Sequence, residues 1–350
     1  MMLDLFPSPT MGPFGRRLRH ARGGKIPVTV LTGFLGAGKT TLLRRFLVTP
    51  EGAGTAVVVN EFGEAGVDDV LVRASTDETV LLGNGCLCCS TRSDLQVALR
   101  GLVADRERGR IPFFRRVVIE TSGLADPGPV LQTFATDRAL GGEFHLEVAV
   151  TVVDAATGLA TLDWSAEARK QAILADRLIL TKTDIAAADL SRETLDRLRA
   201  LNPRAEIVTA IAGEIAPAML TDAPMPSLGG VDHEPGARGF VAEAEHSDGI
   251  ASFVLRQDAP MPWLAFARAM DVLTSLRGAD LLRVKGFLNV EGCSGPVLVQ
   301  FVQHLADPPL ELQDWPDGKR GTRIVFITRN LPERAVRDLF TAVQAVAGAR

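Results

Sequence analysis

The sequence of 350 residues predicts an α/β protein with a mostly parallel β-sheet, followed by a smaller α+β domain. Two observations support this fold class. From Pro27 to about Ala212, short apolar runs alternate with stretches of helical periodicity. After a stretch rich in Pro and Gly, strand-like and helix-like segments follow without that alternation. The hydrophobic content of 46% is enough for two domains, each with its own core.

These patterns divide the chain into four segments. Residues 1–25 are basic and lack the apolar core of a secretory signal, so we expect a disordered extension there, with a misplaced start or a transit peptide as the alternatives. Residues 26–212 are predicted to form the α/β domain, residues 213–247 a linker, and residues 248–350 the α+β domain. The strands and helices expected in the last domain are Ile250–Arg256, Trp263–Leu276, Arg283–Val290, Arg323–Thr328 and Pro332–Val346.

The first predicted site is a phosphate-binding loop. Residues 33–40 match the motif G-x-x-x-x-G-K-[ST] in full. The apolar run Ile26–Leu31 precedes the loop and residues 41–47 follow it with helical spacing, so strand, loop and helix occur in the required order. The glycines let backbone N–H groups point at phosphate oxygens, reinforced by the helix N-terminus. The predicted nucleotide contacts are Gly33, Gly36, Ala37, Gly38, Lys39, Thr40 and Thr41.

Two residues of this loop have predicted catalytic roles. Lys39 is expected to reach the β- and γ-phosphates. Thr40 supplies a hydroxyl that we expect to coordinate Mg²⁺, which bridges the same phosphates.

The base is predicted from a motif further along the chain. The apolar run Arg177–Leu180 leads into Thr-Lys-Thr-Asp, a variant of the asparagine-lysine-x-aspartate motif that binds guanine. Asp184 can accept hydrogen bonds from the N1–H and amine of guanine, which adenine does not offer, at about 1.5–3 kcal/mol each. Lys182 can lay its methylene stem along the base, and Thr181 stands where asparagine is usual. GTP is therefore the predicted nucleotide; a solvated turn after a strand is the alternative.

A third segment is predicted to act in hydrolysis. Arg116–Glu120 has the pattern of a buried strand that ends in a carboxylate, and Gly123 follows with a backbone N–H expected to approach the γ-phosphate. Glu120 is predicted to act on the Mg²⁺ shell or on the attacking water, with capping of the next turn as its alternative. The sequence identifies no glutamine placed to orient that water. Val148–Asp154 is predicted to be another buried strand, with Asp154 either a cap or a functional carboxylate.

Three of the four cysteines lie within residues 86–89. Adjacent cysteines bridge each other poorly, so we expect no disulfide framework and a reducing compartment. Thiolates at this spacing can converge on one soft or borderline cation, of which Zn²⁺ is the most available. The predicted zinc ligands are Cys86, Cys88, Cys89 and, as an oxygen ligand, Glu64. Buried structural cysteines are the alternative for the cluster, and Cys293 is predicted to be a turn cysteine.

Together these motifs resemble those of the CobW-type GTPases, relatives of HypB and UreG within the P-loop class. The resemblance extends from Val28 to near the C-terminus. The motifs that carry it are Gly33–Thr41, Asn60–Glu64, Asn84–Cys89, Glu120–Pro127, Thr181–Asp184, Lys285–Leu288, Trp315–Pro316 and Arg323–Leu331.

The resemblance implies a P-loop GTPase domain and a CobW-like C-terminal domain. It also implies a GTP-dependent metallochaperone, in which metal on the Cys-x-Cys-Cys motif passes to a client protein, with zinc as the favoured cargo. Two alternatives stay open. One is insertion of cobalt or another metal, for cobalamin synthesis or one client enzyme; the other is a redox- or zinc-sensing regulator that binds partners with little turnover. Because relatives in this class often act as dimers, the resemblance allows a homodimer.

Charge and hydropathy argue against two other classes of partner. The net charge of −4 gives no field that would attract nucleic acid or an anionic membrane. No apolar stretch approaches the ~20 residues that a membrane-spanning helix needs. We therefore expect a cytoplasmic protein.

Overall fold

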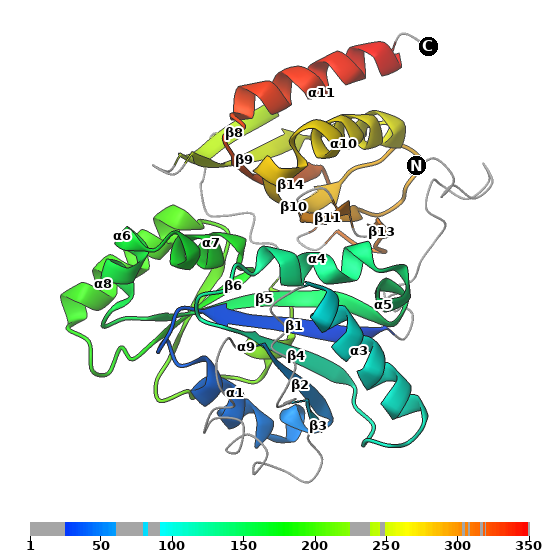
Figure 1. Cartoon of the computed structure of the whole chain (residues 1–350). Coiled ribbons are helices and arrows are strands. Elements are labelled where there is room, and N and C mark those ends of the chain that lie inside the picture. Colours follow the sequence, from blue (N-terminus) through cyan, green and yellow to red (C-terminus); the bar gives the residue numbers. More distant parts are fainter. Residues whose placement is uncertain are drawn as a thin grey trace. The chain divides into compact units, whose positions relative to one another are not determined.

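The structure is a computed structural model. It describes residues 25–60, 80–82, 92–224, 239–245, 249–302, 305–306, 309–315, 318 and 320–348. The chain divides into two compact units, one spanning Lys25–Ser227 and the other containing Leu228–Arg350 (Figure 1). Each unit has its own sheet and its own core.

A parallel sheet forms the centre of the first unit and confirms the predicted fold class. Its strand order is β3-β2-β4-β1-β5-β6-β7, and every pairing is parallel. The strands are β1 (Ile26–Gly33), β2 (Thr55–Asn60), β3 (Val80–Leu82), β4 (Arg116–Thr121), β5 (Phe144–Asp154), β6 (Arg177–Thr181) and β7 (Glu206–Ala210). The strand order reverses around β1, with β4 on one side and β5 on the other, and ligands bind at such a switch point in open α/β sheets.

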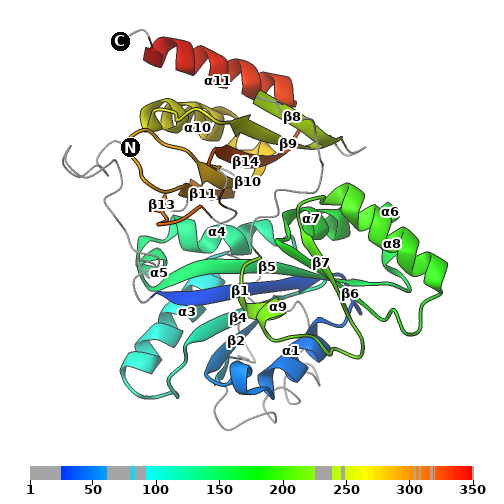
Figure 2. The ribbon, with the colours of Figure 1, turned by 180° about the vertical axis from the view of Figure 1, so that it is seen from behind.

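Helices cover both faces of this sheet because its strands are apolar on both sides. Leu42, Leu43 and Phe46 of α1 pack with Val150 and Val152 of β5 in one core cluster. Figures 1 and 2 both show α4 and α7 on the face opposite α1. The helical elements of the unit are α1 (Lys39–Leu47), η1 (Pro50–Gly52), α3 (Arg92–Glu107), α4 (Gly128–Thr136), α5 (Arg138–Glu143), α6 (Gly158–Trp164), α7 (Ala166–Leu174), α8 (Ala188–Leu201) and α9 (Ala218–Thr221).

The expected linker, residues 213–247, contains regular structure at both of its described ends. Near its start, the buried guanidinium of Arg177 donates to the carbonyl oxygens of Met219 and Asp222 at 2.7 and 2.9 Å, which ties α9 to β6. Near its end, β8 (Gly239–Glu245) pairs with β9 (Ile250–Gln257). A four-residue helix and a strand after a Pro- and Gly-rich run are both too weak to detect as patterns.

The second unit is an antiparallel sheet with two long helices. Its strand order is β12-β11-β10-β14-β9-β8, with β13 paired to β11. The remaining elements are α10 (Trp263–Arg277), η2 (Gly278–Asp280), β10 (Leu281–Leu288), β11 (Val297–Val302), β12 (Leu305–Ala306), β13 (Leu310–Glu311), β14 (Thr322–Arg329) and α11 (Glu333–Gly348). The predicted α+β character of this part is confirmed, although the sequence did not reveal β8 or β11.

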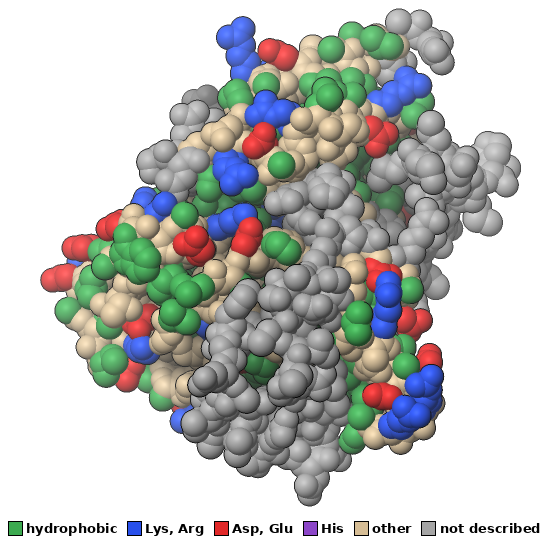
Figure 3. Space-filling model, viewed as in Figure 1, with side chains coloured by type: hydrophobic (Ala, Val, Ile, Leu, Met, Phe, Trp, Pro, Cys, Tyr) green, Lys and Arg blue, Asp and Glu red, His purple; other side chains and the backbone are tan. Residues whose placement is uncertain are grey.

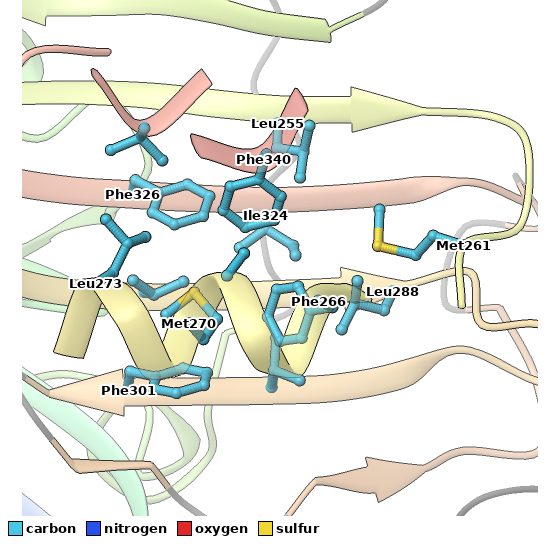
Figure 4. Packing of buried hydrophobic residues seen from close by; sticks show 14 of the residues in the cluster. Leu255, Met261, Phe266, Met270, Leu273, Leu288, Phe301, Ile324, Phe326 and Phe340 are labelled. Carbon is cyan, nitrogen blue, oxygen red and sulfur yellow. The ribbon is translucent and has the colours of Figure 1, made fainter. Parts of the chain in front are cut away.

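Phenylalanine side chains pack with Leu, Ile and Met side chains in the core of this second unit (Figure 4). Phe266 of α10 and Phe340 of α11 have ring centroids 6.1 Å apart, and Phe340 also meets Phe326 of β14 edge-on at 6.0 Å. Phe326 in turn stacks on Phe253 of β9 at 5.4 Å. Such pairs contribute about 0.5–1.5 kcal/mol each beyond their burial, so they fix both helices on one face of the sheet.

Cys293 closes a turn, as predicted, because its backbone N–H donates to the Val290 carbonyl at 3.2 Å, and its side chain is buried in this core. Burial, together with the nearby Glu311 carboxylate, raises the pKa of its thiol to about 12. The thiol is therefore protonated at neutral pH, and a protonated, buried thiol is a poor nucleophile and a poor metal ligand.

We expect Cys293→Ala to leave the number of reactive thiols unchanged in the native protein at pH 7. The same substitution should lower that number by one in denaturant, where burial no longer protects the thiol. Titration with a soluble disulfide reagent measures both values. A loss of one reactive thiol from the native variant would contradict the buried, protonated state.

Two surface findings complete the description. Among the described residues, no helix is long and apolar enough to cross a membrane. On the face drawn in Figure 3, Lys and Arg side chains are interspersed with Asp and Glu, and neither sign forms a continuous field over the described residues.

Candidate nucleotide-binding site

The candidate site lies at the carboxyl end of β1, where the phosphate-binding loop enters α1. Gly38 is the N-cap of α1 in a left-handed conformation, with φ of 100°. The first turn of α1 carries no acidic side chain and no side-chain cap. Its backbone N–H groups and the positive end of its dipole therefore face the loop without a competing anion from the cap or the first turn.

Gly33 allows the loop to leave the sheet. Its φ is +138°, a conformation that side-chain-bearing residues rarely adopt. A Cβ at this position would lie 2.3 Å from the carbonyl oxygen of Val152, its partner on β5. Only glycine therefore permits this turn against β5.

Lys39 is folded into the curl of the loop. Its Nζ donates to the carbonyl oxygens of Gly33 and Phe34 at 2.9 and 3.2 Å, and the side chain is buried. The ring of Phe34 meets Trp164, at the end of α6, edge-on at 5.4 Å, which holds the outer side of the loop. The ammonium group thus lies inside a loop of backbone dipoles, where a phosphate would be its natural counter-ion.

Thr40, at the start of α1, contacts Glu120, at the end of β4. The Thr40 hydroxyl donates to Oε1 of Glu120 at 2.7 Å, and the Glu120 side chain is buried. The register of the sheet causes this contact, because β4 pairs directly with β1 and places Glu120 beside Leu31. A hydroxyl and a carboxylate at this separation are hard oxygen donors of the kind that Mg²⁺ prefers, so the pair fits the predicted ion.

The segment after β4 lies against the loop. Thr121 donates to the hydroxyl of Thr32 at 2.9 Å, which continues the link between β4 and β1. A Cβ on Gly123 would lie 2.5 Å from the backbone nitrogen of Leu35. Gly123 therefore lies close against the backbone of the phosphate-binding loop.

The predicted base motif is tied directly to the same loop. Thr181, the last residue of β6, donates from its hydroxyl to the Ala37 carbonyl at 2.7 Å. Lys182 follows in a left-handed conformation, with φ of 58°, and its Nζ donates to Oδ2 of Asp154 at 2.6 Å. Asp184 is exposed and makes no ion pair with another described residue. An exposed carboxylate beside a fixed lysine can accept hydrogen bonds from a base.

The capping role considered for Asp154 is observed, and the same carboxylate also contacts the predicted base motif. Its Oδ1 accepts from the N–H groups of Ala156 and Thr157 at 2.6 and 3.3 Å, as a cap does. Its Oδ2 pairs with Lys182 of the base motif, because Asp154 and Thr181 are neighbours across β5 and β6. The hint in the sequence was a carboxylate at the end of a buried strand.

Gln171 of α7 is a further polar residue at the site that sequence analysis did not single out. Its Nε2 donates to the carbonyl oxygens of Gly123 and Ala125, both at 3.0 Å. The sequence gives no clear hint of this role, because α7 mixes charged and apolar residues around Gln171.

The predicted zinc ligands Cys86, Cys88, Cys89 and Glu64 lie outside the described residues. Within the described ranges, no group of three or more His, Cys, Asp or Glu side chains could hold a metal ion.

Two models of known protein families match the chain. Residues 27–209 match the model of the CobW/HypB/UreG nucleotide-binding domain. Residues 250–344 match the model of the cobalamin synthesis protein CobW C-terminal domain. The chain belongs to the CobW/HypB/UreG family. The resemblance inferred from the motifs is therefore confirmed, and with it a nucleotide-hydrolysing P-loop protein of the GTPase class.

Relatives within the CobW/HypB/UreG family match over nearly the whole chain. The zinc chaperone YjiA of Escherichia coli is 37% identical, over 91% of this chain and 99% of its own length. The zinc chaperone CobW of a Sinorhizobium species is 33% identical, over 93% and 99%. The crystal structure of Zn(II)-bound YjiA GTPase from E. coli covers 91% of this chain and 99% of its own, with a TM-score of 0.65 and 30% identity.

Proposed function

We propose that this protein hydrolyses GTP and uses the nucleotide cycle to carry zinc to a client protein. The proposal rests on the observation that the predicted phosphate, magnesium and base residues form one connected site. The phosphate-binding loop contacts Glu120 through Thr40, Gly123 through Leu35, and the base motif through Ala37. The predicted triphosphate and base sites thus share one loop, as a nucleotide that spans both would require.

Each end of a bound GTP meets its own residues in this proposal. Lys39 and the first turn of α1 hold the β- and γ-phosphates, and Gly123 offers its N–H to the γ-phosphate. Thr40 and Glu120 would hold Mg²⁺, which neutralises charge on the phosphates as the terminal bond breaks. Glu120 acts on the attacking water or on the shell of the ion.

Guanine recognition rests on Asp184 and Lys182. The Lys182 ammonium is fixed by Asp154, so its methylene stem is available to cover a base while Asp184 accepts the guanine donors. The bonds between a carboxylate and these two donors would favour GTP over ATP.

Asp184→Asn should weaken GTP binding roughly ten- to a hundredfold, because the asparagine carbonyl can still accept one of the two bonds and the loss of the other costs about 1.5–3 kcal/mol. The asparagine amide can donate to the C2 carbonyl of xanthine, so the variant should gain affinity for xanthosine triphosphate. Competition of GTP, ATP and xanthosine triphosphate against a fluorescent GTP analogue measures these changes. An unaltered preference for GTP over ATP in the variant would remove Asp184 from base recognition.

Zinc is the proposed cargo for two reasons. Thiolates at the spacing of Cys86, Cys88 and Cys89 suit a soft or borderline cation. The relatives that match most of the chain are named zinc chaperones, and the matched YjiA crystal structure contains Zn(II). A client protein and a homodimer stay predictions from the family resemblance, and a cytoplasmic location stays a prediction from the hydropathy of the sequence.

Cys88→Ser should remove most of the zinc affinity of the reduced protein, because a hydroxyl replaces one thiolate ligand. Cys293→Ala is the matched control, since that buried thiol should contribute nothing. Titration against a chromogenic chelator gives both affinities. Stoichiometric, tight zinc on the serine variant would place the metal elsewhere.

A further inference from the structure

Gln171 connects α7 to the turn that follows β4. The turn, residues 122–125, is closed by the N–H of Ala125, which donates to the Ser122 carbonyl at 3.0 Å. The Gln171 amide donates to two further carbonyl oxygens of this turn, those of Gly123 and Ala125, both at 3.0 Å. One side chain therefore fixes the orientation of two peptide groups in the turn.

Gln171 is itself held rigidly. Only 1% of it is exposed, and its backbone carbonyl accepts from the Thr151 hydroxyl of β5 at 2.7 Å. Both of its side-chain contacts are carbonyl acceptors, so the amide nitrogen must face the turn. Its Oε1 is buried without a hydrogen-bond partner among the described residues. A buried amide with an unsatisfied oxygen is costly, and an apolar side chain of the same length would avoid that cost.

Lys170, the residue before Gln171, also binds α7 to the segment that follows β4. Lys170 forms an ion pair with Asp126, directly after the turn, and Asp126 also accepts from the N–H of Gly128 at the start of α4. Residues 123–126 are thus bound to α7 at three points. The same turn brings Gly123 against Leu35 of the phosphate-binding loop.

We propose that Gln171 is a positioning residue for GTP: it orients the 122–125 turn so that the Gly123 N–H is directed at the γ-phosphate. This inference rests on the proposed function and adds the group that controls its γ-phosphate contact. Gln171 touches neither nucleotide nor water in this role and acts only through Gly123. GDP lacks the γ-phosphate, so Gln171 contributes to binding of GTP and not of GDP.

Gln171→Glu tests the proposal, with Asn202→Asp as the matched control. Asn202 is also buried and donates from its amide to carbonyls at the end of α7, those of Ala172, Ile173 and Ala175. Both substitutions replace amide donors by a carboxylate beside carbonyl oxygens, but only Gln171 contacts the turn.

The measurements are the affinities of the full-length protein for GDP and for a non-hydrolysable GTP analogue, and its kcat and KM for GTP. In Gln171→Glu we expect the ratio of analogue to GDP affinity to fall about tenfold, with a lower kcat, while GDP binding persists. In Asn202→Asp the ratio should stay that of the wild type, even where the protein is less stable. Gln171→Met removes the two donated bonds together with the unsatisfied Oε1 and introduces no charge, so it should show the same fall in the affinity ratio if the carboxylate of Gln171→Glu prevents folding.

The outcomes separate this inference from the proposed function. If the wild-type protein binds GTP analogue and GDP and hydrolyses GTP, but the Gln171 variants keep its affinity ratio and kcat, Gln171 is a structural residue and the inference is wrong. If the wild-type protein neither selects nor hydrolyses GTP, the proposed function itself fails.

Discussion

Lys39→Ala should lower the kcat for GTP hydrolysis by at least about a hundredfold, the usual cost of removing one preorganised group that stabilises developing charge. The ammonium lies within the phosphate-binding loop, held by the carbonyls of Gly33 and Phe34, and its charge opposes that of the phosphates. Release of inorganic phosphate from GTP in the steady state measures the effect.

Lys25→Ala is the control for this substitution. Lys25 lies just before the other end of β1 and donates to the Gly141 carbonyl, away from the loop. Lys25→Ala should therefore leave GTP turnover unchanged. Equal turnover in Lys39→Ala and the wild-type protein would mean that the loop does not bind the triphosphate as proposed.

Gly33→Ala should destabilise the first unit by about 3 kcal/mol or more, because strained backbone and atomic overlap occur together. The new Cβ would lie 2.3 Å from the Val152 carbonyl oxygen, and the φ of +138° disfavours alanine. The overlap can be relieved only if β1 separates from β5 at the point where the phosphate-binding loop begins. Nucleotide affinity should fall together with stability.

Urea unfolding of the full chain measures this loss. Two units can unfold separately, so the relevant transition is the one that added GDP shifts to higher urea. Gly101→Ala is the control. Gly101 lies in α3, and an alanine Cβ there would meet no described atom within 4 Å beyond its own helix backbone, so the substitution should stabilise by about 0.5–1 kcal/mol. A Gly33 variant as stable as the wild type would show that the loop can leave the sheet in another way.

Local patterns were sufficient to predict the fold class and the strands that carry the candidate site residues. The apolar runs before residues 33, 120 and 181 became β1, β4 and β6, each with its motif at the carboxyl end. Because carboxyl ends of parallel strands share one edge of a sheet, this topology brings together motifs that are far apart in the sequence. Thr181 and Ala37 do meet, although 144 residues separate them.

Contacts that depend on strand order could not be read from the sequence. The pair of Asp154 and Lys182 exists because β5 and β6 are neighbours, and the contact of Gln171 with Gly123 exists because α7 packs near the end of β4. Neither Asp154 nor Gln171 is marked by a local motif in the sequence. Strand β8 was missed because its short segment follows a stretch of Pro and Gly that predicted a linker.

The central claim is that GTP controls metal affinity, and zinc affinity in the two nucleotide states tests it most directly. The reduced protein is titrated with zinc against a competing chelator, once with Mg²⁺ and a non-hydrolysable GTP analogue and once with Mg²⁺ and GDP. The proposed function predicts at least about a tenfold difference in affinity, equivalent to about 1.4 kcal/mol of coupling. Equal zinc affinity in the two states would contradict a GTP-gated carrier and favour a regulator that binds partners.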